Sequence, residues 1–239
     1  MKLLLTSSGL HNESLKAALR GMLAKPVGEC SFLFIPTSYH AAVSDMSWLV
    51  DDIYQSHSMG WKQYLVLDIA VKSSWDKKLW WHMIEEADVI MVGGGNAGYL
   101  SYWLEKSGLF EVLPELLKTK VYVGVSAGSM VMTAGLQSTR IGNPDAPADY
   151  EVNLDDPTLP IGQVSRKSLG FVDFLFRPHW HKPHPKYDSL TEEAVRKAYA
   201  VIKKPIYLVD DETGIKIVDG QLEVISEGKW VLVDSEQAQ

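Results

Sequence analysis

Three observations in this 239-residue chain predict an α/β fold, a three-layer α/β/α sandwich with a mostly parallel central sheet. Apolar runs of strand length alternate with helical patterns, and repeated βα units of this kind form parallel sheets. The runs 89–92 and 121–125 are apolar throughout, as expected of strands that helices cover on both faces. A glycine-containing turn follows each of these runs. Because ligands in such sheets bind beyond the carboxyl ends of the strands, we expect both turns to meet in one cleft.

The elements of the first half follow from these patterns. The apolar run 3–5 stops at polar Thr6, so it is predicted to be a first strand rather than the start of a signal peptide. Short apolar runs predict the further strands 31–35, 64–68, 89–92 and 121–125. Longer segments with helical spacing predict helices over 13–23, 44–58, 74–86 and 97–107, and one that begins at Ala127.

The second half begins with a change of composition. Residues 136–163 are rich in Asn, Asp, Pro and Gly and show no sustained period, so we expect a long surface loop over the site. Beyond this loop the patterns predict a strand over 170–176, a helix over 191–203, and strands over 206–209, 214–218 and 222–233 with Asp219-Gly220 as a hairpin turn. No linker interrupts the chain, which favours a single domain over 1–239.

The composition argues against several classes of function. A net charge of -7 without a clustered basic face argues against a nucleic-acid partner. No apolar stretch approaches the roughly 20 residues of a membrane helix, so no membrane partner is expected. Cys30 is the single cysteine and cannot form an internal disulfide, which fits a reducing, cytoplasmic compartment. The aromatic content is compatible with a homodimer.

Gly124-Val-Ser126-Ala-Gly128 lies between a predicted strand and a helix start of small residues. A serine that points outward from a tight strand-to-helix bend needs glycine two residues before and two residues after it, because a Cβ there would collide with the bend. The same turn places amide N–H groups at a helix N-terminus, where an oxyanion can be held. The alternative is a plain glycine-rich strand end, but the position between strand and helix favours a catalytic nucleophile at Ser126.

Gly93-Gly-Gly95-Asn96 ends the strand 89–92 and opens the next helix. The segment lacks the Lys-Ser/Thr pair of a phosphate-binding P-loop. Gly93, Gly95 and Gly98 match the spacing of a dinucleotide-binding turn, but the acidic residue expected at the end of the next strand is missing. We therefore expect no nucleotide cofactor and interpret a glycine of this segment as an oxyanion donor, paired with the amide of Ala127.

A serine nucleophile needs a general base, and the sequence offers His11, His40, His57, His82, His179, His181 and His184. We expect the base to be His179. It follows the predicted strand 170–176 and comes directly after Pro178, whose rigid backbone can hold an imidazole at the cleft.

His179, His181 and His184 could instead form a metal site. The cluster contains no cysteine or acid, and Pro183 lies between two of its histidines, so no metal is expected.

The third member of such a site should be a carboxylate that orients the imidazole. Asp210, Asp211 and Glu212 follow the predicted strand 206–209, and Asp145 lies in the long loop. The run 210–212 can also be a solvated turn, so these residues leave the acid open.

Four motifs together resemble the dipeptidase E and cyanophycinase family of serine peptidases: Val92-Gly-Gly-Gly-Asn96, Gly124-Val-Ser-Ala-Gly128, Arg177-Pro-His179 and Asp211-Glu-Thr-Gly214. The resemblance covers most of the chain, from the first strand to Gly220 or beyond. It implies a fold similar to that of class I glutamine amidotransferases, with serine in place of cysteine, a small peptide substrate and no cofactor. Ser126 would be the nucleophile and His179 the base, and Gly95 and Ala127 would be the oxyanion donors.

The resemblance is compatible with either Glu212 or Asp145 as the acid. We expect Glu212, because a position after a strand holds a side chain better than a loop does. The order Ser126, His179, Glu212 also argues against an α/β-hydrolase esterase, in which the acid precedes the histidine. With Asp145 as the acid, chain order would not discriminate.

The substrate is less constrained. The dipeptidase selects an N-terminal aspartate and cyanophycinase an aspartyl-arginine polymer, so the resemblance implies cationic or polar groups that bind a carboxylate. Arg140, Arg166 and Arg177 are near enough in sequence to supply one. Residues 179–184 and 142–160 depart from the dipeptidase pattern, which leaves aspartyl specificity open. A non-catalytic relative that binds a small molecule or a partner is the alternative from another class.

Overall fold

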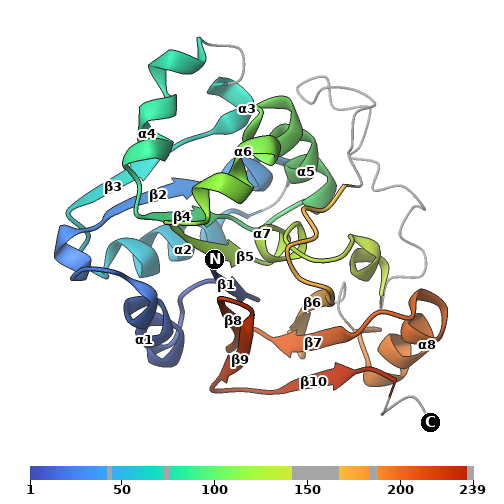
Figure 1. Ribbon diagram of the computed structural model, residues 1–239. Coiled ribbons are helices and arrows are strands. Elements are labelled where there is room, and N and C mark those ends of the chain that lie inside the picture. Colours follow the sequence, from blue (N-terminus) through green and yellow to red (C-terminus); the bar gives the residue numbers. More distant parts are fainter. Residues whose placement is uncertain (42–44, 73–75, 142–166, 183–187, 236–239) are drawn as a thin grey trace.

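The computed structural model describes residues 1–41, 45–72, 76–141, 167–182 and 188–235 (Figure 1). None of the helices in these ranges combines the length and the apolar character needed to cross a membrane.

The centre of the fold is a seven-stranded mixed sheet. Its strands are β1 (Lys2–Thr6), β2 (Ser31–Ile35), β3 (Gln63–Val66), β4 (Val89–Val92), β5 (Val121–Val125), β8 (Thr213–Val218) and β9 (Gln221–Ser226). Their order is β3-β2-β4-β5-β1-β8-β9, in which the first five pair in parallel and β8 and β9 are antiparallel. The expected α/β fold with a mostly parallel sheet is therefore present.

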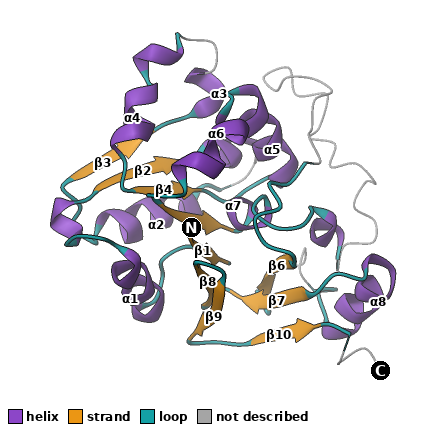
Figure 2. Cartoon of the chain, viewed as in Figure 1, coloured by secondary structure: helices purple, strands orange, loops and turns teal. Residues whose placement is uncertain are grey.

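Helices cover both faces of this sheet (Figure 2). The elements of the two layers are α1 (Glu13–Met22), α2 (Ser47–His57), α3 (Ile69–Lys72), α4 (Trp81–Glu86), α5 (Ala97–Lys106), α6 (Leu109–Leu116) and α7 (Ala127–Met130). One apolar core joins α1 and α2 to Leu4, Phe32 and Phe34 of the strands, and a second joins the remaining helices to Leu3 and Leu33. Successive strand residues thus point into opposite cores, as the pleat requires.

A smaller sheet with the order β10-β7-β6 lies beside the main one. Its strands are β6 (Leu175–Trp180), β7 (Ile206–Asp210) and β10 (Trp230–Val233), and α8 (Glu192–Ile202) packs against them through buried Val195. β6 and β7 are parallel, and β10 is antiparallel to β7. Only Asp211 and Glu212 separate β7 from β8 of the main sheet, so these two residues stand where the two sheets meet.

Most predicted elements lie within a few residues of the observed ones, and the Asp219-Gly220 hairpin turn between β8 and β9 has positive φ at both positions. Three predictions were wrong. The segment 74–86 is not one helix, because its described part consists of the 3-10 turn η3 (Lys77–Leu79) and α4. The segment 222–233 is split between β9 and β10, which belong to different sheets.

The third error bears on the site. The strand predicted over 170–176 runs instead over Leu175–Trp180, because pairing with β7 begins only at Leu175. His179 therefore lies inside β6 rather than after a strand. The helix α6, which the sequence patterns did not predict, follows Gly108 and contains Pro114, and both residue types signal breaks.

Candidate active site

Ser126 occupies a strained turn between β5 and α7. Its backbone has φ 47° and ψ -103°, a conformation that residues other than glycine rarely adopt. Its N–H donates to the carbonyl of Thr6 at 2.9 Å. A Cβ on Gly124 would lie 2.6 Å from the Ser129 nitrogen, and one on Gly128 would lie 2.1 Å from the Val92 oxygen. Both glycines are thus required by the turn, as predicted for a nucleophile position.

His179 meets Ser126 from the smaller sheet. Its Nε2 lies 2.9 Å from the Ser126 Oγ, and its backbone N–H donates to the Ser7 Oγ at 2.9 Å. The register of β6 shifts between Arg177 and Trp180, and His179 has a φ of 68°. This irregularity departs from the alternation of a regular strand and directs the imidazole at the serine.

The carboxylate against His179 is that of Asp211. His179 Nδ1 donates to Asp211 Oδ1 at 2.7 Å, which leaves Nε2 free of its proton and facing Ser126 in the neutral ring. The Ser7 hydroxyl donates to the same carboxylate oxygen at 2.9 Å, and the Lys182 ammonium lies 3.2 Å from Asp211 Oδ2.

The expectation of Glu212 as the acid is therefore not met by the geometry. The carboxylate of Glu212 accepts from the Asn12 side chain at 3.0 Å, and Asp210 accepts from Thr213 at 2.7 Å. Asp210 at the end of β7 and the two residues that connect it to β8 are adjacent acids, yet each has a different set of hydrogen-bond partners. Asp145, the alternative, lies outside the described residues.

Electrostatics favour a charged aspartate and a neutral histidine. Burial alone would raise the pKa of Asp211, but the hydrogen bond and charge of His179, the charge of Lys182 and the Ser7 hydroxyl outweigh it and lower that pKa strongly. Burial lowers the pKa of His179, and Lys182 and Arg177 add to this effect against the opposing influence of Asp211. A neutral imidazole at neutral pH is the form that can accept a proton.

Ala127 directly follows Ser126, and the glycine-containing loop that includes Gly95 approaches the serine turn from the end of β4. Ala127 is the first residue of α7, where an N–H has no acceptor within the helix. Gly95 has a φ of 122° and lies in the loop between β4 and α5; a Cβ on its neighbour Gly94 would lie 3.4 Å from the Ser126 Cβ. The glycine loop (residues 93–95) and the serine turn thus meet in one place, as the sequence predicts.

Other candidates from the sequence lie elsewhere. His181 stacks on Trp180 with 4.2 Å between ring centroids, and His184 lies outside the described residues. Within the described part of the chain no three potential metal ligands gather. Arg177 is buried and its Nε donates to the Ile141 carbonyl at 3.0 Å. Arg166 and the side chain of Arg140 are not among the parts described.

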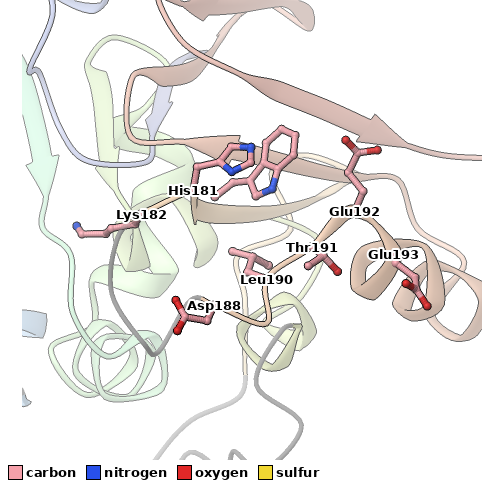
Figure 3. A pocket seen from close by; sticks show the side chains of 8 residues that line it. His181, Lys182, Asp188, Leu190, Thr191, Glu192 and Glu193 are labelled. Atoms are coloured by element: carbon pink, nitrogen blue, oxygen red, sulfur yellow. The ribbon is translucent and has the colours of Figure 1, made fainter.

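Two residues at the site were not anticipated. Ser7 follows β1 at the carboxyl edge of the parallel strands, a position that could have suggested it. Lys182 comes three residues after His179 and also lines a pocket of about 560 Å³ with Trp180, His181, Asp188, Leu190, Thr191, Glu192 and Glu193. In Figure 3 Lys182 extends at one end of this pocket and the two glutamates at the start of α8 lie at the other.

A serine on a strand-to-helix turn, in contact with a histidine that an aspartate holds, places the chain structurally among serine hydrolases with α/β folds. The family model of Peptidase family S51 matches residues 3–225. The chain belongs to peptidase family S51, the peptidase E family, which confirms the resemblance seen in the sequence motifs.

Individual relatives are distant. Peptidase E of Streptomyces coelicolor is 25% identical over 156 residues, which cover 65% of this chain and 52% of that protein. Peptidase E of Nostoc sp. is 26% identical over 147 residues, 60% of this chain and 54% of the relative. The chain thus spans about half the length of these curated relatives.

Solved structures agree on the fold. A crystal structure of a peptidase E protein from Listeria monocytogenes superimposes with a TM-score of 0.72 at 19% identity, covering 95% of this chain and 98% of that one. A peptidase from an acI-B1 Actinobacterium gives a TM-score of 0.64 at 16% identity, with 98% and 90% covered. These likenesses confirm the α/β fold.

Proposed function

We propose that the protein is a serine peptidase of the peptidase E type that hydrolyses short peptides through an acyl-enzyme. The observation that carries this proposal is the continuous contact from Ser126 Oγ through His179 to Asp211. Family membership supports a peptide as the substrate.

In the proposed reaction His179 Nε2 accepts the proton of Ser126 Oγ as this oxygen attacks the peptide carbonyl. The negative charge that develops on the carbonyl oxygen is received by the amides of Gly95 and Ala127. His179 then donates the proton to the leaving amine, which departs and leaves an ester on Ser126. A water molecule, deprotonated by the same imidazole, hydrolyses that ester and restores the serine.

Within this site we assign the orienting role to Asp211. Its negative charge stabilises the imidazolium that forms during attack, and its hydrogen bond selects the tautomer with an unprotonated Nε2. Ser7 and Lys182 hold the carboxylate from two further directions.

The first test is covalent labelling with a fluorophosphonate, a reagent that reacts with activated serines, followed by mass spectrometry to locate the adduct. We expect labelling at Ser126, and we expect it to be lost in Ser126→Ala and His179→Ala. Turnover of a dipeptide panel that includes N-terminal aspartyl peptides should fall by about 10⁴-fold or more in Ser126→Ala. Absence of both labelling and turnover in the wild type would refute the proposal and favour a binding role for the cleft.

A further inference from the structure

The glycine loop next to Ser126 is shaped by a second segment, the 3-10 turn η2 (Thr37–Ala41). The Ser38 hydroxyl lies within hydrogen-bonding distance of the carbonyls of Gly93, at 2.8 Å, and Gly94, at 2.6 Å. A Cβ on Gly93 would lie 2.0 Å from the Tyr39 ring, and one on Gly95 would lie 2.2 Å from the Ser38 carbonyl oxygen. The path of the loop therefore follows the surface that Ser38 and Tyr39 present.

Tyr39 is fixed in place by contacts with two residues of α2, Trp48 and Asp52. The side chain is fully buried, its ring stacks on Trp48 with 4.4 Å between centroids, and its hydroxyl donates a short hydrogen bond to Asp52 Oδ2. Burial, the charge of Asp52 and their hydrogen bond raise the pKa of Tyr39 well above the usual range, while the Gly94 backbone acts in the opposite direction. The hydroxyl thus stays protonated between the carboxylate of α2 and the backbone of the glycine loop.

Asp52 is a buried acid that the proposed mechanism does not use. Its side chain is 4% exposed, and its Oδ1 accepts no hydrogen bond from the described residues. His11 Nε2 approaches this oxygen to 3.6 Å from the loop after β1. A carboxylate buried with so few partners costs stability.

The charges around His11 come from two directions. Asp52 faces it from α2, and Asp211 and Glu212 act on it from the connection between β7 and β8. The polar contact with the Asp52 side chain raises the pKa of His11 most, burial opposes this rise, and the charges of Asp52, Asp211 and Glu212 add to it. A cationic ring at this position can therefore balance the charge of Asp52.

We propose that Tyr39 and Asp52 are positioning residues for the glycine loop, and that they hold it where its amide can receive the oxyanion, with His11 as the counter-charge. This inference rests on the proposed peptidase function. A hydroxyl donated to a fixed carboxylate ties the Tyr39 ring to α2, and the ring in turn sets the position of Gly93. A phenylalanine would fill the same space against Gly93 but would leave that tie broken and Asp52 without its donor.

The test compares Tyr39→Phe with a matched control, Tyr64→Phe. Tyr64 is also a largely buried tyrosine whose hydroxyl contacts α2, at 2.8 Å from the Ser56 Oγ. Its ring packs against Phe32 and His57, on the side of β2 and α2. We expect Tyr39→Phe to lower kcat by about 10- to 100-fold. Displacing an oxyanion donor should reduce kcat less than deleting it, which reduces kcat by about 10²- to 10³-fold. KM and the acidic limb of the pH profile, which reports His179, should not change.

Further variants separate positioning from stability. Tyr64→Phe should keep kcat within about threefold of the wild type even where its melting temperature falls as far as that of Tyr39→Phe. Asp52→Asn keeps an acceptor for the Tyr39 hydroxyl and should retain more kcat than Asp52→Ala. His11→Gln, at a partly exposed position, should cost kcat about two- to fivefold without changing KM, as expected for a modest charge interaction.

Several results would overturn the inference. The inference is wrong if folded Tyr39→Phe has the wild-type kcat. It is also wrong if Tyr64→Phe loses as much kcat as Tyr39→Phe, or if Tyr39→Phe changes KM alone. If Tyr39→Phe does not fold, wild-type kcat in both Asp52→Ala and His11→Gln, with thermal melts showing folded protein, would have the same meaning. An unreactive wild type, in contrast, would refute the proposed function itself, because the comparison needs a wild-type rate.

Discussion

The nucleophile side and the base side of the site are built in different ways. Ser126 and the glycine loop each follow directly from an uninterrupted parallel strand of the main sheet. His179 and Asp211 lie at irregularities of the chain instead. The histidine sits at a register shift inside β6, and the aspartate sits in the two-residue connection between the two sheets.

The difference shows that one side of a site can follow from residues that are neighbours in the chain, while the other side depends on how two sheets are joined. Ser7 belongs to both halves. It extends from β1, and its hydroxyl accepts from the His179 backbone and donates to Asp211. The contrast can be tested by changing residues that act on one side only.

The largest expected effect is on the base side, in Asp211→Asn. An asparagine of the same shape loses the charge and can impose the wrong tautomer on His179, so kcat/KM should fall by about 10³- to 10⁴-fold. The adjacent Glu212→Gln is the control and should stay within about threefold, because its side chain contacts Asn12 rather than the histidine. Steady-state kinetics on a responsive dipeptide measure both. A reversed order of effects would restore Glu212 as the orienting acid.

The next effect is on the nucleophile side, in Gly128→Ala. The added Cβ would meet the Val92 carbonyl at 2.1 Å, so the turn must open and carry Ser126 away from His179. We expect a loss of about 1–3 kcal/mol in the free energy of unfolding, together with a loss of fluorophosphonate labelling of about 100-fold. Gly21→Ala, in α1 where a Cβ meets nothing within 4 Å, should leave labelling intact and not lower the melting temperature. Wild-type labelling in Gly128→Ala would contradict the tight-turn account.

A smaller effect is expected from Ser7→Ala, which removes the link between the two sides. Its hydroxyl contacts both the backbone and the partner of His179, so kcat should fall by about 10-fold, the magnitude of one hydrogen bond to a charged group. Ser101→Ala, which removes another buried hydroxyl that donates to the Lys167 carbonyl, should leave kcat unchanged. Equal kcat losses in the two variants would show that the contacts of Ser7 with His179 and Asp211 do not contribute to catalysis.

The smallest effect is a change in pH dependence from Lys182→Gln. Lys182 lowers the pKa of His179, and activity requires the neutral ring, so activity rises as pH passes upward through that pKa. Removing the ammonium should therefore move the acidic limb of kcat/KM to higher pH, while the plateau changes by less than about threefold, since the pair is partly exposed. Lys167→Gln, whose partner is Glu105, serves as the control. A limb that stays in place would show that Lys182 does not tune the base.

Much of the main sheet was predictable from residue patterns. The limits of β2, β4 and β5 match the predicted ranges, because each is a short, largely apolar run with a clear end. Pro36 follows β2, Gly93 follows β4 and Ser126 follows β5. The nucleophile turn was predictable for the same reason, since its glycines and its serine are neighbours in the chain. In contrast, the sequence patterns did not predict α6, since Gly108 precedes it and Pro114 lies within it, and both residue types often break helices. Burial of Leu109 and Leu113 nevertheless stabilises this helix.

Residue patterns therefore sufficed for the parallel α/β sheet and for the tight turn at Ser126 with its flanking glycines, since each rests on interactions within a few residues. His179 was expected because of Pro178 and a predicted strand that the structure places elsewhere, and its approach to Ser126 depends on the register shift within β6. The acid could not be chosen from residue patterns. Asp210, Asp211 and Glu212 are alike in type and adjacent in sequence, and which of them reaches His179 depends on the angle at which β7 leaves one sheet and β8 enters the other. The same holds for Ser7, Lys182 and the Tyr39–Asp52 pair, because their partners are brought together by packing between segments far apart in the chain.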